Sequence, residues 1–113
     1  MESMPEEYII VYCTVPDRVV ADRIIERVIA EKLTPCVNII PGLFSVYRWK
    51  GEIRRESELL LMMKTRRNLF GTLSAAIKET HSYEVPEIIA VPLSAGYTPY
   101  LSWIDENTVS AFL

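Results

Sequence analysis

The spacing of hydrophobic positions changes several times along the chain, and each change marks a new element. Residues 8–15 are mostly β-branched or aromatic, which predicts a strand. Over residues 18–32 the apolar positions recur every three or four residues, which predicts a helix with Asp17 as its N-cap. A second helical pattern covers residues 65–80, where Thr65 is the predicted cap. Each predicted helix has one apolar face and one polar face.

Two long strands lie between the predicted helices. The first covers residues 36–49 and contains Pro41-Gly42, which indicates an edge strand or a bulge. The second covers residues 52–64, and Lys50-Gly51 between them is typical of a tight hairpin turn. Both arms are longer than a typical strand of about 5–6 residues. We therefore expect the hairpin to project beyond the rest of the domain.

A fourth strand at residues 87–93 and a short helix at residues 99–105 complete the predicted order, βαββαβ plus one helix. This order is that of the split βαβ, or ferredoxin-like, α+β fold. Its antiparallel sheet has four strands and carries both helices on one face. The length of 113 residues suits one domain over residues 1–113.

Three of the predicted strands are apolar on both faces, at residues 9–11, 59–63 and 88–91. Helices can cover only one face of such a sheet, and an exposed apolar face would be a large adhesive patch. We therefore expect the chain to assemble through its sheets, with the hairpin adding to the edge of a neighbouring sheet. Trp49, on the hairpin, is expected to be largely buried against another subunit.

Composition narrows the class of protein. Half of the residues are hydrophobic and the mean hydropathy is +0.14, so a disordered chain is excluded. A net charge of −3 argues against nucleic acid as a partner. No apolar run approaches the ~20 residues that span a bilayer, and residues 1–7 are acidic where a signal peptide would be basic. A cytoplasmic protein without a membrane partner is expected, and its two cysteines are expected to remain reduced.

Several segments resemble, in colinear order from about residue 8 to residue 104, the CutA family of divalent-cation tolerance proteins. The matching segments are Val11-Tyr-Cys-Thr-Val-Pro-Asp17, Pro35-Cys-Val-Asn-Ile-Ile-Pro-Gly42, Tyr47-Arg-Trp-Lys-Gly51, Lys64-Thr65, His81-Ser-Tyr-Glu-Val-Pro-Glu87 and Tyr100-Leu-Ser-Trp103. The resemblance implies a cytoplasmic homotrimer with a ferredoxin-like fold, architecturally similar to PII signalling proteins. It also implies a response to metal ions, no assigned reaction and no organic cofactor.

The resemblance further implies copper, or another divalent cation, as a ligand of Cys13, Cys36 and His81. Thiolate and imidazole suit copper and zinc. The predicted topology brings Cys13 and His81 to one end of the sheet and leaves Cys36 roughly 15–20 Å away, at ~3.3 Å per residue. Buried thiols and a loop histidine without a metal role are the alternative. His81 has no recognisable nucleophile as a partner, so we do not expect an enzyme.

A second group of residues suits a small anionic ligand at a subunit boundary, as expected for a PII-like regulatory trimer. This group comprises Trp49, Lys64, Tyr83, Glu84 and Glu87. The alternative is that these side chains are anchors of the trimer interface. Glu56 and Glu58 share one strand face, but hairpin carboxylates of this kind are usually solvated. An unidentified protein partner also remains open.

Overall fold

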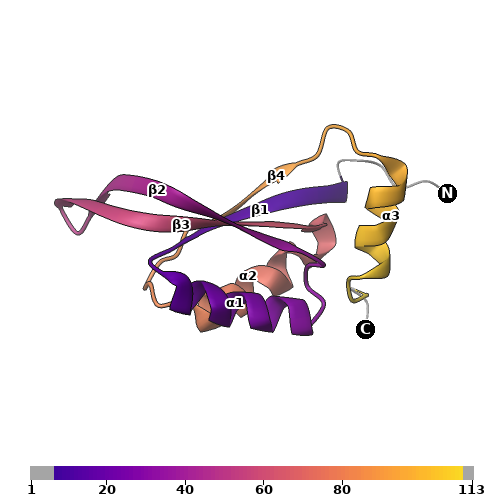
Figure 1. Cartoon of the computed structure of the whole chain (residues 1–113), viewed down its shortest axis with the longest axis horizontal. Coiled ribbons are helices and arrows are strands. Elements are labelled where there is room, and N and C mark those ends of the chain that lie inside the picture. Colours follow the sequence, from indigo (N-terminus) through magenta and orange to yellow (C-terminus); the bar gives the residue numbers. More distant parts are fainter. Residues whose placement is uncertain (1–6, 111–113) are drawn as a thin grey trace.

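The computed structural model describes residues 7–110 as one four-stranded antiparallel sheet with two helices on one face (Figure 1). The strands lie in the order β2-β3-β1-β4. Their bounds are β1 Tyr8–Val15, β2 Val37–Trp49, β3 Glu52–Arg66 and β4 Ile88–Pro92. The helices are α1 Arg18–Ala30, α2 Phe70–Thr80 and α3 Thr98–Glu106, and a 3-10 turn, Arg67–Leu69, precedes α2. The predicted ferredoxin-like order is confirmed.

Helix α1 begins where the sequence predicts. The carboxylate of Asp17 accepts a hydrogen bond of 2.9 Å from the backbone N–H of Val20, which satisfies one of the free donors of the first turn. Apolar residues at helical spacing, among them Val20, Ile24 and Val28, are buried against the sheet. The N-cap therefore fixes where the chain turns back from β1 onto the helical face.

The beginning of the second helix differs from the prediction. Thr65 is not a cap but a buried residue of β3, and its hydroxyl donates a hydrogen bond of 2.7 Å to the carbonyl of Leu33. The strand continues to Arg66, and α2 starts only at Phe70 after the 3-10 turn. Because the hydroxyl of Thr65 is already engaged by the loop after α1, it cannot cap a helix.

The β2–β3 hairpin is the longest feature of the molecule and projects away from the helices (Figure 1). Lys50 and Gly51 form its turn with positive φ angles of 50° and 79°, as a two-residue hairpin loop requires. The expected irregularity in β2 is present as a register shift between Ile40 and Leu43. Strand β1 pairs with β3 only as far as Leu59. Beyond that residue, β2 is the only strand beside β3 in the described part of the chain.

The two faces of the sheet have different surroundings. The helical face carries a core that includes Val11, Cys13 and Met63, all without exposed surface. On the opposite face the side chains of β4 are open, with Ile89 53% exposed and Val91 42% exposed. The expectation of strands that are apolar on both faces is therefore met, and residues 7–110 leave Ile89 and Val91 on the second face about half exposed.

Helix α3 closes the end of the molecule that is remote from the hairpin turn (Figure 1). Its residues Leu101 and Ile104 are buried with Tyr8, whose hydroxyl donates a hydrogen bond of 2.7 Å to the carboxylate of Asp105. None of the helices between residues 7 and 110 has both the length and the apolar composition to cross a bilayer.

We expect Asp17→Ala to lower the free energy of unfolding by about 1 kcal/mol, because it removes the N-cap of α1. The matched control is Asp22→Ala, which breaks an exposed ion pair with Arg18 and should cost about 0.5 kcal/mol or less. Urea denaturation at one fixed protein concentration measures both. Equal losses in the two variants would contradict the assigned cap.

Candidate functional site

His81 connects the end of α2 to the end of β1. The ring is 8% exposed, and its Nε2–H donates a hydrogen bond of 2.8 Å to the carbonyl oxygen of Thr14. The backbone N–H of Tyr83 donates to the other ring nitrogen, Nδ1, at 3.0 Å. This pair of bonds assigns the proton to Nε2 and leaves Nδ1 as the nitrogen that carries the lone pair. A metal ion would have to compete with Tyr83 for that nitrogen.

Cys13 lies directly before Thr14 on β1 and has no exposed surface. Its thiol donates a weak hydrogen bond, 3.7 Å long, to the same Thr14 carbonyl that His81 contacts. Burial, and then the negative charges of Glu87 and Glu58, raise the pKa of the Cys13 thiol to about 12. The structure therefore brings Cys13 and His81 to one end of the sheet, with the thiol protonated at neutral pH.

Cys36 lies elsewhere. It directly precedes β2, whose first residue, Val37, faces Met63 on β3, whereas Cys13 faces Leu61 from the other side of β3. The two cysteines are offset by three residues along the strands and by two strand spacings across the sheet. Together these offsets separate them by roughly 14 Å. Within residues 7–110, no three His, Cys, Asp or Glu side chains gather closely enough to hold a metal ion. The three ligands implied by the sequence do not converge in one chain.

A pocket of about 440 Å³ lies between the hairpin and the segment that leads from α2 to β4. Four of the five residues grouped from the sequence line it. Its lining is Thr14, Tyr47, Trp49, Arg54, Glu56, Glu58, Ser82, Tyr83, Glu84, Val85 and Glu87. Lys64 is the exception to the expected group, because its Nζ donates a hydrogen bond of 2.5 Å to the side-chain oxygen of Asn38, next to Cys36. The lysine on which an anionic ligand would depend is therefore not in the pocket.

Glu58 departs most from the expectation of a solvated hairpin carboxylate, since it is only 6% exposed. The hydroxyl of Tyr83 donates a hydrogen bond of 2.7 Å to its Oε2. Burial, and then this bond to Glu58, raise the pKa of Tyr83, so that the phenol stays protonated. Burial and a hydrogen bond with Glu56 likewise raise the pKa of Tyr47. The alternation of residues along β3 was sufficient to predict that Glu56 and Glu58 share one face. The burial of Glu58, however, depends on Tyr83 from a distant segment.

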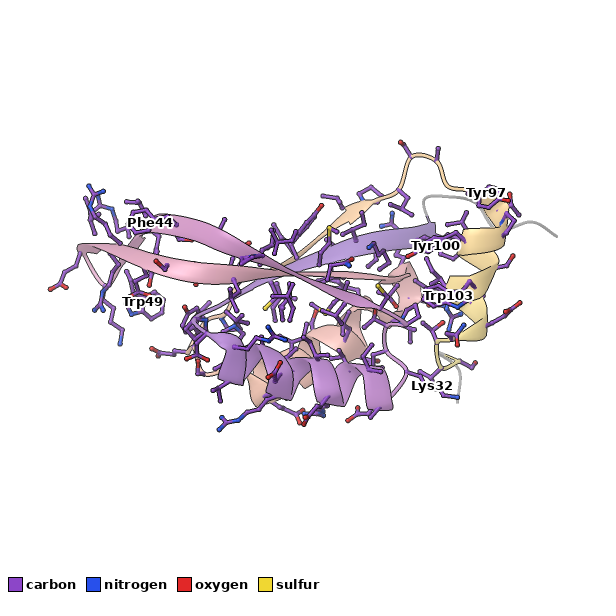
Figure 2. The ribbon with its side chains drawn as sticks, viewed as in Figure 1. Lys32, Phe44, Trp49, Tyr97, Tyr100 and Trp103 are labelled. Atoms are coloured by element: carbon purple, nitrogen blue, oxygen red, sulfur yellow. The ribbon has the colours of Figure 1, made fainter. Side chains whose placement is uncertain are left out.

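The hairpin turn contacts the other wall of the pocket. Lys50 Nζ lies 3.4 Å from the Glu84 carboxylate and 5.6 Å from the centre of the Trp49 ring. Figure 2 shows Trp49 on the hairpin, on the opposite side of the ribbon from Phe44 and far from the aromatic residues of α3. Both charged groups are exposed, so the ion pair contributes little to stability. It does place a cation beside the aromatic wall.

Comparison with known proteins gives consistent matches. The family model of the CutA1 divalent ion tolerance protein matches residues 9–107. A divalent-cation tolerance protein CutA of Thermus thermophilus is 46% identical over 99 residues, which cover 88% of this chain and 96% of that protein. The crystal structure of CutA1 from Oryza sativa has a TM-score of 0.89 at 42% identity and covers 96% of this chain and 99% of its own.

Plant relatives are longer than this chain. The chloroplastic protein CutA 1 of Oryza sativa is 44% identical over 100 residues, or 88% of this chain. Those residues are 56% of the plant protein, so the chain spans little more than half the length of this relative.

We expect the Cys13 thiol to be alkylated by iodoacetamide at least a hundredfold more slowly in the native protein at pH 8 than in urea. The reason is that a pKa of about 12 leaves almost no thiolate, and burial excludes the reagent. Mass spectrometry of the single variants Cys13→Ser and Cys36→Ser follows each thiol separately. Equal native and denatured rates for Cys13 would contradict its placement.

Proposed function

The chain belongs to the CutA1 divalent ion tolerance protein family, and we propose that it acts there as a homotrimer that binds copper or another divalent cation. The family consists of tolerance proteins that are not enzymes, so the chain binds or regulates rather than catalyses. The observation that carries the proposal is the family match over residues 9–107, nearly the whole described chain. Copper as the ligand and three as the number of subunits go beyond the family assignment and are proposed separately below.

The open face of the sheet supports assembly. Ile89 and Val91 of β4 and Ile40 of β2 are exposed, although a sheet face that meets water is normally polar. The hairpin supplies a second contact, because the edge of β3 beyond Leu59 has backbone groups that β1 does not reach. A neighbouring subunit that covers the face and pairs with this edge satisfies both. These features support other copies of this chain as its principal partners, and the number three rests on the family resemblance.

Cys13 and His81 support copper binding, since they share the Thr14 carbonyl and provide a thiol and an imidazole. Both groups would have to change to become ligands. The thiol must lose a proton that its raised pKa retains, and Nδ1 of His81 must release the N–H of Tyr83. Two ligands make an open site of modest affinity, and the order of stabilities favours copper over zinc. Cys36 contributes only where another subunit brings it close.

We also propose a cytoplasmic location for this chain. Cys13 and Cys36 are both free and lie far apart, which suits a reducing compartment. Some relatives work elsewhere, as the chloroplastic name of the rice protein states. The net charge of −3 is consistent with the absence of nucleic acid among the proposed partners.

We expect the parent protein to remain a folded trimer in sedimentation velocity experiments down to nanomolar concentration. Ile89→Lys should raise the dissociation constant on the order of a hundredfold, because it places an unpaired charge in the apolar face. The matched control is Val19→Lys, which changes a similarly exposed apolar residue on α1 and should leave assembly unchanged. A folded monomer of the parent at nanomolar concentration, or equal behaviour of the two variants, would contradict the proposed interface.

We expect anaerobic copper titration to give affinities that Cys13→Ser and His81→Ala each weaken at least tenfold and that Cys36→Ser hardly changes. Because the Cys13 pKa is about 12, the thiolate fraction rises with pH throughout the accessible range. The affinity of the parent should therefore increase by roughly tenfold per unit between about pH 7 and pH 9. Cys13→Ser should reduce this slope.

Sedimentation of the same variants separates loss of ligands from loss of assembly. Weakening confined to Cys36→Ser would place the ion between subunits rather than at the end of β1. Unchanged binding in all three variants would refute a copper site built from these residues.

A further inference from the structure

Within residues 7–110, Glu58 is a buried carboxylate without a cationic partner. It is 6% exposed, and no Lys, Arg or His nitrogen of residues 7–110 lies within ion-pair distance of it. Among the described residues, its carboxylate accepts one hydrogen bond, from the neutral phenol of Tyr83 to Oε2. A buried charge with so little compensation is costly, and proteins normally pair it. Glu58 also lines the 440 Å³ pocket, so the missing partner has space to enter.

The rest of the pocket selects for positive charge. Glu56, Glu84 and Glu87 line it together with Glu58, against Arg54 as the one basic residue of the lining. Lys50 adds a charge at the rim, but it is already engaged with Glu84. Within residues 7–110, a ligand in this pocket therefore meets a lining with more negative than positive charge.

The walls of the pocket are aromatic. Tyr47 and Trp49 from β2 and Tyr83 from the opposite segment line it. Faces of aromatic rings attract ammonium and guanidinium groups, and Lys50 Nζ already lies 5.6 Å from the Trp49 ring centre. A volume of about 440 Å³ is within the usual range for small-molecule sites and is far larger than a bare ion needs. The carboxylates are also too dispersed for metal coordination, since no group of three forms among the described residues.

We propose that this pocket binds a small organic cation, an aliphatic amine or guanidinium compound, with Glu58 as its charge partner and Trp49 as its aromatic wall. One cationic group pairs with the Glu58 carboxylate beside Tyr83. The chain of the ligand lies along the aromatic residues, and the outer carboxylates favour a second cationic group. The site uses neither the Cys13 thiol nor the His81 ring, although the charge of Glu58 contributes to the raised pKa of Cys13.

The test is isothermal titration of the full chain with 1,5-diaminopentane. Pentane-1,5-diol and glutarate, at matched ionic strength, serve as the neutral and anionic probes. We expect saturable binding of the diamine at one molecule per chain and no binding of the other two. Quenching of Trp49 fluorescence in a Trp103→Phe background should follow the same isotherm. Absence of saturable diamine binding at millimolar concentration, or binding of glutarate instead, would overturn the proposal.

Glu58→Gln keeps the size of the side chain and an acceptor for Tyr83 but removes the charge. It should weaken diamine binding on the order of tenfold or more. Glu26→Gln, an exposed residue of α1 outside the pocket, is the matched control and should bind as the parent does. Trp49→Leu, at a half-buried position, gives a second test and should weaken binding severalfold.

Circular dichroism and sedimentation establish that each variant is folded and assembled as the parent is. Equal diamine affinity in Glu58→Gln and the parent would overturn the proposal. So would a parent that binds no diamine while Glu58→Gln changes the state of assembly, because a basic side chain of a second copy would then occupy the pocket. Copper affinity measured on the parent and on Trp49→Leu, which leaves the charges around Cys13 unchanged, distinguishes this failure from failure of the proposed function.

Discussion

The difference in length between two paired strands governs much of this structure. Strand β3 has 15 residues and β1 has 8, so the central pairing ends at Leu59 while β3 continues to the hairpin turn. The continuation has β2 on one edge and no strand of residues 7–110 on the other. The acidic aromatic pocket is lined by side chains of this part of the hairpin and of the segment after His81. The projecting hairpin and the pocket are thus two results of one mismatch.

The end of β1 near Leu59 also positions the Cys13 thiol and the His81 imidazole. The Thr14 carbonyl accepts from the His81 ring and weakly from the Cys13 thiol, so one backbone oxygen positions both groups. This arrangement is well satisfied without a metal ion, which means that ligation must compete with existing hydrogen bonds. Family membership therefore indicates a role in tolerance to divalent cations, whereas the local geometry determines how tightly this chain could bind such a cation.

Local signals in the sequence were sufficient for elements whose partners are close in the chain. The Asp17 cap and the Lys50-Gly51 turn are of this kind. Long-range contacts explain the differences. The Thr65 hydroxyl is engaged by Leu33, 32 residues earlier, and Glu58 is buried with Tyr83, 25 residues later. Lys64 adjoins a family-like motif, but its position along β3 places its side chain beside Asn38 of β2. This neighbour can be identified only when the register between the two strands is known.

The free edge of β3 also bears on how a single chain avoids aggregation before the proposed assembly. Residues 52–58 read Glu-Ile-Arg-Arg-Glu-Ser-Glu, so charges of both signs are spread along the segment that lacks a second strand neighbour. Charged side chains on an open edge discourage unselective pairing with other extended chains, which is the first step toward fibrils. A single chain can therefore keep its long hairpin extended with less risk of unselective pairing. Replacing these charges with β-branched apolar residues would strengthen the strand and remove its protection against aggregation.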